Sequence, residues 1–222
     1  MTFFLFLVLV KLMPMNPQHL FYGIVFVKSL DMNGLIKYLS NKIDLSFAAK
    51  QYVMSISTHQ KIKKGDVLLS QGNKVDSIYF VEDGCLRSFS LDKHGNEHTL
   101  QFAIKNWWLS DYRSTHNNKL SELTVECIKE ANIIQISVDD FYHALKTFPE
   151  LDKVHRENLE NRVSALETRI LDQLMLSASA RYEEFQIKYS DIESLIPNYC
   201  IASYLGIAKE SLSRIRIKKE AN

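Results

Sequence analysis

The stretch "KKGDVLLSQGNKVDSIYFVEDGCLRSF", from Lys63 to Phe89, decides how this chain folds. It alternates short runs of β-branched and aromatic residues with glycines, a composition typical of antiparallel strands joined by turns. Glycine accepts a positive φ angle without steric cost, so Asp83-Gly84 predicts a hairpin turn between two of these strands. The stretch therefore predicts a domain built mainly from β-strands.

The same pattern continues on the C-terminal side of this stretch. A turn at His94-Gly95-Asn96 leads into the strand "EHTLQFAI", and the runs "LTVECI" and "NIIQIS" follow. Six or more short strands at regular spacing predict an antiparallel sandwich or roll. On the N-terminal side, apolar residues at helical spacing between positions 33 and 57 predict helical structure.

The hydrophobic period becomes helical from Val138, and after Pro149 a long helix is predicted through Ala180. Apolar residues along it alternate four- and three-residue steps, and charged residues flank them. This predicted seam consists of Leu159, Val163, Leu166, Ile170 and Leu174. One amphipathic helix lying on a core is the alternative, but so narrow a seam favours a homodimeric coiled coil.

The C-terminal segment from 197 to 219 predicts two short helices around a glycine. Pro197 lies near the start of the first helix and Gly206 at its end, which is the usual asymmetry. Ala202 supplies the small side chain that two crossing helices need. The apolar residues that would pack together are Ile201, Leu205, Ile207, Leu212 and Ile215. This pattern is typical of a helix-turn-helix, whose second helix enters the DNA major groove.

Polar side chains on the second helix are predicted to point away from its apolar stripe. They are Lys209, Glu210, Ser213, Arg214 and Arg216, and Lys218 is added to the DNA-binding set as a phosphate contact. Lysine and arginine suit guanine edges and phosphates, while glutamate can accept from cytosine. An ordinary solvated helix end would explain Lys218 and Lys219, but not the accompanying alanine, glycine and apolar spacing.

Composition narrows the options. The chain has 222 residues and a net charge of +1, so a nucleic-acid site would have to be a local patch. The three cysteines, Cys85, Cys127 and Cys200, lie far apart with no CxxC spacing. They predict buried thiols in a reducing cytoplasm, with no metal site and no cofactor.

The first 31 residues do not fit this organisation. The apolar run Phe3 to Val10 ends at Lys11 and is far shorter than the roughly 20 residues that span a bilayer. No basic residue precedes it, as a signal peptide would require. We expect translation to start at Met32 and residues 1–31 to lie outside the native fold; a secretory or membrane-anchoring role is the alternative.

With these features in place, the chain resembles the bacterial Crp/Fnr transcription regulators from Leu35 to Lys219. The stretch from Lys63 to Phe89 is similar to that family's first β-roll strands. "IASYLGIAKESLSRIR" is similar to its recognition unit, especially in Bacteroidetes-type members. The resemblance implies an α+β fold, a homodimer, double-stranded DNA and RNA polymerase as partners, and no membrane.

The residue patterns and the resemblance together predict an order of domains. An apolar extension at 1–31 would be followed by a cyclic-nucleotide-binding-like β-roll at 32–148. A dimerisation helix at 149–180 and a helix-turn-helix DNA-binding domain at 181–222 would complete the chain.

The family's base-reading positions fall on Lys209, Glu210 and Arg214. Lys209 stands where arginine is common, which removes bidentate geometry. Ala208 occupies the N-cap position where serine or threonine is usual, at a cost of roughly 0.5–2 kcal/mol.

The family's cyclic-AMP cassette is not matched. That cassette carries a Gly-Glu pair and, further on, an Arg-Ser pair that neutralises the phosphate. Here no Gly or Glu lies between Ile104 and Ser110, and the arginine position falls on Ser121. Arg113-Ser114 comes too early in the chain. Cyclic AMP is therefore not the expected effector.

Trp107, Trp108 and Tyr112, with Arg113 beside them, are the candidate pocket for another small-molecule effector. The alternative is that these aromatic residues belong to the core. An iron–sulfur sensor would need four ligand cysteines. His94 and His98 straddle a predicted turn, so we expect exposed imidazoles rather than a metal site.

Three function classes follow from the sequence. A DNA-binding transcriptional regulator explains the C-terminal pattern. A ligand-binding β-roll module that acts through protein partners, without specific DNA binding, leaves that pattern unexplained. An enzyme ranks last, because the chain has no glycine-rich phosphate loop, nucleophile elbow or metal-spaced histidines.

Overall fold

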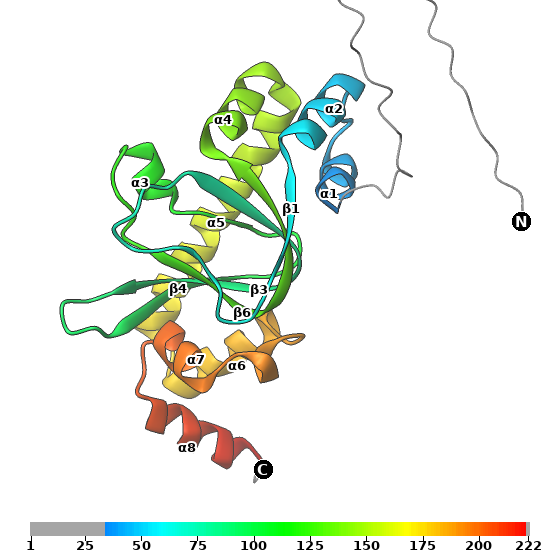
Figure 1. Ribbon diagram of the computed structural model, residues 1–222. Helices are drawn as coiled ribbons and strands as arrows, with labels where there is room; N and C mark the ends of the chain where they lie inside the picture. Colours follow the sequence, from blue (N-terminus) through cyan, green and yellow to red (C-terminus); the bar gives the residue numbers. More distant parts are fainter. Residues whose placement is uncertain (1–33, 221–222) are drawn as a thin grey trace, which may run out of the picture. The chain divides into compact units, whose positions relative to one another are not determined.

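A computed structural model describes residues 34–220 of the chain. The expectations for residues 1–31 and for a start at Met32 lie outside these residues. Helices flank a central sheet along the chain, and the C-terminal part is wholly helical (Figure 1). The predicted α+β class is confirmed.

Residues 34–220 form a six-stranded sheet in which every pairing is antiparallel. The main strand order is β1-β6-β3-β4; β2 also pairs with β6, and β5 with β3. The strands are β1 (Thr58–Ile62), β2 (Val67–Leu69), β3 (Ser77–Leu91), β4 (Glu97–Ala103), β5 (Trp108–Leu109) and β6 (Thr124–Ser137). The prediction of an antiparallel β domain is therefore confirmed, although β1 was not predicted as a strand.

The predicted hairpin turn at Asp83-Gly84 is wrong. β3 runs without interruption through this point, and its register against β6 shifts between Val81 and Leu86. Gly84 has a φ of 91°, and a Cβ atom there would lie 2.3 Å from the carbonyl oxygen of Glu130. The glycine permits a bulge and a close approach of two backbones inside one long strand.

The turn predicted at His94-Gly95-Asn96 is confirmed, because it joins β3 to β4 with Gly95 at a φ of 81°. The two runs "LTVECI" and "NIIQIS" merge into the single strand β6. Positive φ angles therefore mark both a turn and a bulge in this sheet, and the sequence signal for the two is the same.

Helices from both ends of the β region share one core. They are α1 (Gly34–Lys42), α2 (Phe47–Ile56), α4 (Val138–Thr147) and the start of α5 (Pro149–Met175). Leu35, Val53, Phe141 and Leu151 from these helices pack with Ile134 of β6. Burying each such side chain contributes about 1.5–3 kcal/mol, so this cluster fixes α5 against the sheet.

The long helix is shorter than predicted. α5 ends at Met175, and α6 (Ala178–Lys188) begins after Ser177, whose side chain accepts a hydrogen bond from the Ala180 backbone N–H at 3.2 Å. An N-cap serine starts a new helix because it satisfies a free backbone donor. The remaining elements are the 3-10 turn η1 (Glu193–Leu195), α7 (Asn198–Leu205) and α8 (Lys209–Glu220), with the short helix α3 (Tyr112–His116) preceding β6.

A second core joins the C-terminal helices to the sheet. Cys85 and Phe102 of β3 and β4 pack with Phe185 of α6 and Tyr204 of α7. The ring of Phe102 lies 5.9 Å from that of Phe185 and 5.4 Å from that of Tyr204, between centroids. The sheet thus supports the C-terminal helices directly.

All three cysteines are free and buried, as predicted. Burial raises the pKa of the Cys85 thiol to about 12, which keeps it protonated and unreactive. Between residues 34 and 220, no helix combines the length and apolar character needed to cross a membrane.

Candidate nucleic-acid interface and effector pocket

The turn between α7 and α8 has the geometry that the sequence predicts. Gly206 ends α7 in the left-handed conformation, with a φ of 66°. The Ile207 N–H donates to the Ala202 carbonyl oxygen at 3.0 Å, which closes the helix end. Ala202 and Leu212 are buried between the helices. The helix-turn-helix prediction is therefore matched in detail at the turn.

Five of the six predicted DNA-contact residues lie exposed on α8. They are Lys209, Glu210, Ser213, Arg214 and Lys218. Lys209 Nζ lies 5.6 Å from the centre of the Tyr199 ring on α7. Within residues 34–220, no side chain forms a hydrogen bond or ion pair with Arg214. The outer face of α8 is thus polar and available to a partner.

Arg216 departs from the prediction. Its Nε donates to the Tyr182 hydroxyl at 2.8 Å, one terminal nitrogen donates to Asn198 Oδ1 at 2.5 Å, and the other forms an ion pair with Glu193. Arg216 therefore ties α8 to α6, η1 and α7 instead of pointing outward. Its position four residues after buried Leu212 places it on the inward face, a signal that the sequence contained.

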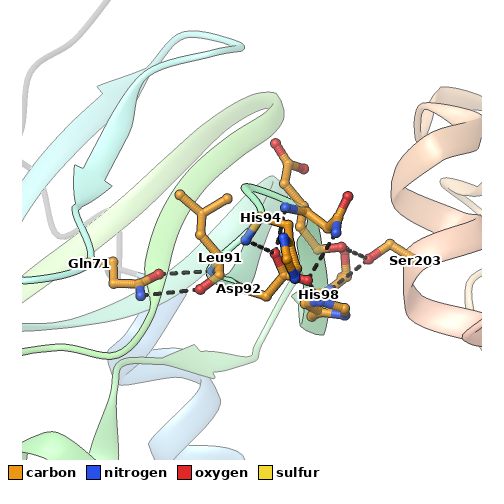
Figure 2. Close-up of polar contacts among 9 residues, drawn as sticks. Gln71, Leu91, Asp92, His94, His98 and Ser203 are labelled. Carbon is orange, nitrogen blue, oxygen red and sulfur yellow. Dashed lines mark hydrogen bonds and ion pairs between the residues drawn. The ribbon is translucent and has the colours of Figure 1, made fainter.

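The helix α7 is bound to the edge strand β4 through Ser203, as Figure 2 shows. The Ser203 hydroxyl donates to the Glu97 carbonyl oxygen at 2.6 Å and accepts from the Thr99 N–H at 2.8 Å. Arg169 of α5 donates to the carbonyl oxygens of Leu100 at 2.7 Å and Tyr204 at 2.8 Å. These contacts connect the sheet, the long helix α5 and α7. No local sequence pattern predicted them.

The hairpin that carries β4 is organised by Asp92 (Figure 2). Its carboxylate accepts from the His94 and Asn96 backbone N–H groups, from the Asn96 side chain and from His98 Nε2 at 3.1 Å. Hydrogen bonds from Asn96 and His98 hold the pKa of Asp92 far below its ordinary value. His98 thus caps a turn, and within residues 34–220 no cluster of His, Cys, Asp and Glu could hold a metal ion.

A buried arginine that the sequence reasoning missed lies beneath α7. Arg87 of β3 is fully buried and pairs with Glu97 at 2.6 Å and Glu126 at 2.5 Å. Its guanidinium carbon lies 4.2 Å from the Phe89 ring centre and 5.4 Å from that of Tyr199. Arg87 therefore links three strands and one helix electrostatically.

The predicted seam of α5 lies largely exposed in the single chain. Val163, Ile170 and Leu174 expose 54%, 59% and 77% of their surface, Leu166 is also exposed, and Leu159 is half-buried. Apolar side chains in such a row are typical of a surface that a partner covers.

A pocket of about 560 Å³ lies among β4, β5, α5 and the C-terminal helices. Trp107, Trp108 and Tyr112, the candidate effector residues, are among its lining residues. Arg113 is not: it is exposed and pairs with Glu122 at 2.8 Å. Because Arg113 lies within the short helix α3, it projects on a different side from Tyr112.

In the segment where the cyclic-AMP cassette would lie, the carboxylate of Asp111 accepts the hydrogen bonds of the surrounding donors. Buried Asp111 accepts from the Ser114 backbone N–H and hydroxyl at 3.0 and 2.7 Å, from the Ser121 hydroxyl at 3.0 Å and from the Glu122 N–H at 3.0 Å. Burial raises the pKa of Asp111, but these hydrogen bonds outweigh it and the pKa falls below the ordinary value. A negative charge already occupies these donors.

Comparison with known proteins agrees with this architecture. Residues 59–148 match the family model described as a cyclic nucleotide-binding domain. The transcriptional activator Anr of Pseudomonas protegens is 24% identical over 177 residues, covering 72% of this chain and 70% of that protein. FnrA of Stutzerimonas stutzeri, also a transcriptional activator, is 22% identical over 172 residues, with the same two coverages.

Solved structures share the fold. A crystal structure assigned to the crp/fnr family, from Eubacterium rectale, has a TM-score of 0.67 at 22% identity and covers 83% of this chain and 88% of that one. The c-di-GMP responsive global regulator CLP of Xanthomonas campestris has a TM-score of 0.63 at 12% identity and covers 79% and 92%.

These features define a transcription regulator with a cyclic-nucleotide-binding-type β domain, a long helix and C-terminal helices. The chain belongs to the Crp/Fnr family. Regulators of this family bind DNA and effectors, and they are not enzymes. The likeness to Bacteroidetes-type members is not supported by these relatives.

Proposed function

We propose that the chain is a sequence-specific DNA-binding regulator that acts as a homodimer in the cytoplasm and responds to a signal other than cyclic AMP. One observation carries this proposal. The α7–Gly206–α8 unit exposes Lys209, Glu210 and Arg214 on one helix, while Arg216 is engaged inward and fixes that helix in place.

On α8, Arg214 is the residue to which we assign base recognition. It is exposed and unpaired within residues 34–220, so its planar group is available for a guanine edge. Lys218 and Lys219 lie on the last turn, where phosphate contacts would make binding depend on salt. Because Lys219 also donates to Gln186 at 2.7 Å, Lys218 is the freer of the two. We leave Arg216 out of the contact set.

The exposed seam supports a dimer of two copies of this chain. Two apolar stripes on α5 would cover each other, and two recognition helices would then face major grooves about 34 Å apart. The target site is expected to be two-fold symmetric for the same reason. Contact with RNA polymerase, implied by the family resemblance, belongs to the same proposal.

The effector is proposed to bind in the pocket beside Trp107, Trp108 and Tyr112. Two features argue against cyclic AMP. The Asp111 carboxylate already accepts the hydrogen bonds of the donors in this segment, and Ser121 stands where the family's phosphate-binding arginine would be. A ligand phosphate would meet a negative charge there rather than a guanidinium.

The test is recovery of genomic DNA fragments by the purified full chain at low and moderate salt. We expect the recovered fragments to share a two-fold-symmetric sequence. Arg214→Ala should lower the affinity for this sequence by about 10- to 100-fold, because one base contact is worth about 1–3 kcal/mol. Arg156→Ala, a change of exposed arginine on α5, is the matched control and should retain binding. Equal, salt-sensitive binding of all sequences by both variants would contradict the proposal.

A further inference from the structure

The charged side chains that line the pocket are all basic. Its lining contains lysine and arginine side chains but neither aspartate nor glutamate. The cations are Lys42, Lys105, Arg162, Arg169 and Lys188. In a partly dehydrated cavity, an excess of positive over negative charge in the lining favours an anion.

Two of these cations have hydrogen-bonding partners. Of the other three, Lys105 and Lys188 are exposed, and Arg162 is half-buried. Lys42 pairs with Glu157 at 2.6 Å, and Arg169 donates to backbone carbonyl oxygens. Arg162 of α5 forms no hydrogen bond or ion pair with any residue between 34 and 220; its guanidinium carbon lies 5.2 Å from the centre of the Tyr112 ring. Arg162 is thus a positioned cation with its donors unused.

Burial makes this arrangement costly for the charge on Arg162. Burial lowers the pKa of Arg162, which Tyr112 and Asp111 only partly offset. A half-buried guanidinium without hydrogen-bonding partners is stabilised when a carboxylate or phosphate binds it, in two parallel hydrogen bonds.

The rest of the wall is aromatic. Tyr38, Trp107, Trp108 and Tyr112 line the pocket, and Lys188 Nζ lies 5.6 Å from the Trp107 ring centre. Aromatic side chains stack favourably on planar apolar groups of a ligand. The pocket volume of about 560 Å³ falls in the range of small-molecule sites.

We propose that this pocket binds a small organic anion with a planar apolar body, whose carboxylate or phosphate lies on Arg162 of the long helix. The donors around Asp111 do not bind the anionic group of this ligand, because they already donate to the Asp111 carboxylate. The inference rests on the proposed function, since it names the class of effector that the regulator recognises. It can nevertheless be tested without DNA.

The chain offers a direct reporter, because Trp107 and Trp108 are its only two tryptophans and both line the pocket. The full chain is titrated with 3-phenylpropanoate, with phenyl phosphate and with the uncharged 3-phenylpropanamide at constant ionic strength. Tryptophan emission and calorimetry are recorded together. Comparison of the two anions distinguishes a carboxylate from a phosphate as the preferred group.

We expect at least one anion to bind about tenfold or more tightly than the amide, the size of one charge-assisted contact. Arg162→Gln should reduce this preference to less than about threefold, while Arg113→Gln, in the exposed arginine of α3, should retain it. Equal binding of anion and amide, or no binding of any probe, overturns the proposal.

A structural role for Arg162 predicts a different result. If Arg162 pairs with a carboxylate of a second copy, Arg162→Gln weakens the dimer and leaves the anion preference unchanged, which also overturns the proposal. Failure of DNA binding in Arg214→Ala is measured separately, so loss of the regulator function and loss of the anion site are distinguishable.

Discussion

The helices α5 and α8 both have one face held by the chain and one face without a partner among residues 34–220, but the free faces differ in chemistry. α5 leaves a row of apolar side chains exposed, whereas α8 leaves lysine, glutamate and arginine. Apolar surface gains free energy when another apolar surface covers it, and charged surface gains it from an opposite charge. The comparison supports the proposal that the two helices serve different partners: a second copy of the chain for α5 and a polyanion for α8.

The largest effect is expected on the inner face of α5. Leu151 is 5% exposed and packs in the core shared with α4 and the sheet. Leu151→Ala should lower the free energy of unfolding by about 2–5 kcal/mol, because it removes apolar contacts and leaves a cavity. Urea denaturation measures this. Phe47→Ala, in a side chain of α2 that is 76% exposed, should change it by less than about 0.5 kcal/mol.

The outer face of α5 should respond through association instead of folding. Ile170→Asp places a charge in the proposed seam, so the dimer should weaken by on the order of 100-fold while the circular dichroism spectrum is retained. Sedimentation velocity over a range of concentrations measures the change. Ser164→Asp, an exposed position beside the seam, should leave the dimer intact; if both variants remain dimeric, α5 is not the interface.

The inner face of α8 is expected to give a smaller loss of stability. Arg216→Gln removes the ion pair with Glu193 and leaves that partly buried carboxylate with fewer partners. We expect the free energy of unfolding to fall by about 1–3 kcal/mol. Arg214→Gln, on the outer face, should leave it unchanged within about 0.5 kcal/mol. Equal stability of the two variants would remove the distinction between the faces.

The smallest effect is a pH dependence on the inner side of α5. Burial lowers the pKa of His155, whose ring lies 5.2 Å from that of Phe141. Its neutral form is favoured in the folded chain, so its contribution to stability is complete above its unfolded pKa of about 6.5 and declines as the pH falls toward the folded value. His155→Gln should flatten the unfolding free energy between about pH 7 and pH 5 relative to the parent chain.

The local sequence predicted those elements whose signals are local. The Gly206 turn, the Gly95 hairpin and the apolar row on α5 all appear in the structure because backbone conformation and periodicity are written in neighbouring residues. Gly84 was misread, since a bulge and a turn require the same positive φ angle. The end of α5 was misplaced because Ser177 acts as a cap only in its observed conformation.

The site was predictable in part. Trp107, Trp108 and Tyr112 do line one pocket, but Arg162 lies some fifty residues further along the chain, and only the fold brings it to them. Arg113 was assigned to the pocket because it lies beside Tyr112, and Arg216 was assigned outward although its spacing from Leu212 places it on the inward face. Their actual partners, Glu122 and Glu193, are set by tertiary contacts that a single sequence does not encode in its spacing.

The bond between Ser203 and β4 has a consequence for solubility. β4 ends the main strand order of the sheet, and its outer backbone groups at Glu97 and Thr99 would otherwise be free to pair with a strand from another molecule. Ser203 and Arg169 occupy those groups, so the C-terminal helices act as a cover that prevents edge-to-edge aggregation of the sheet.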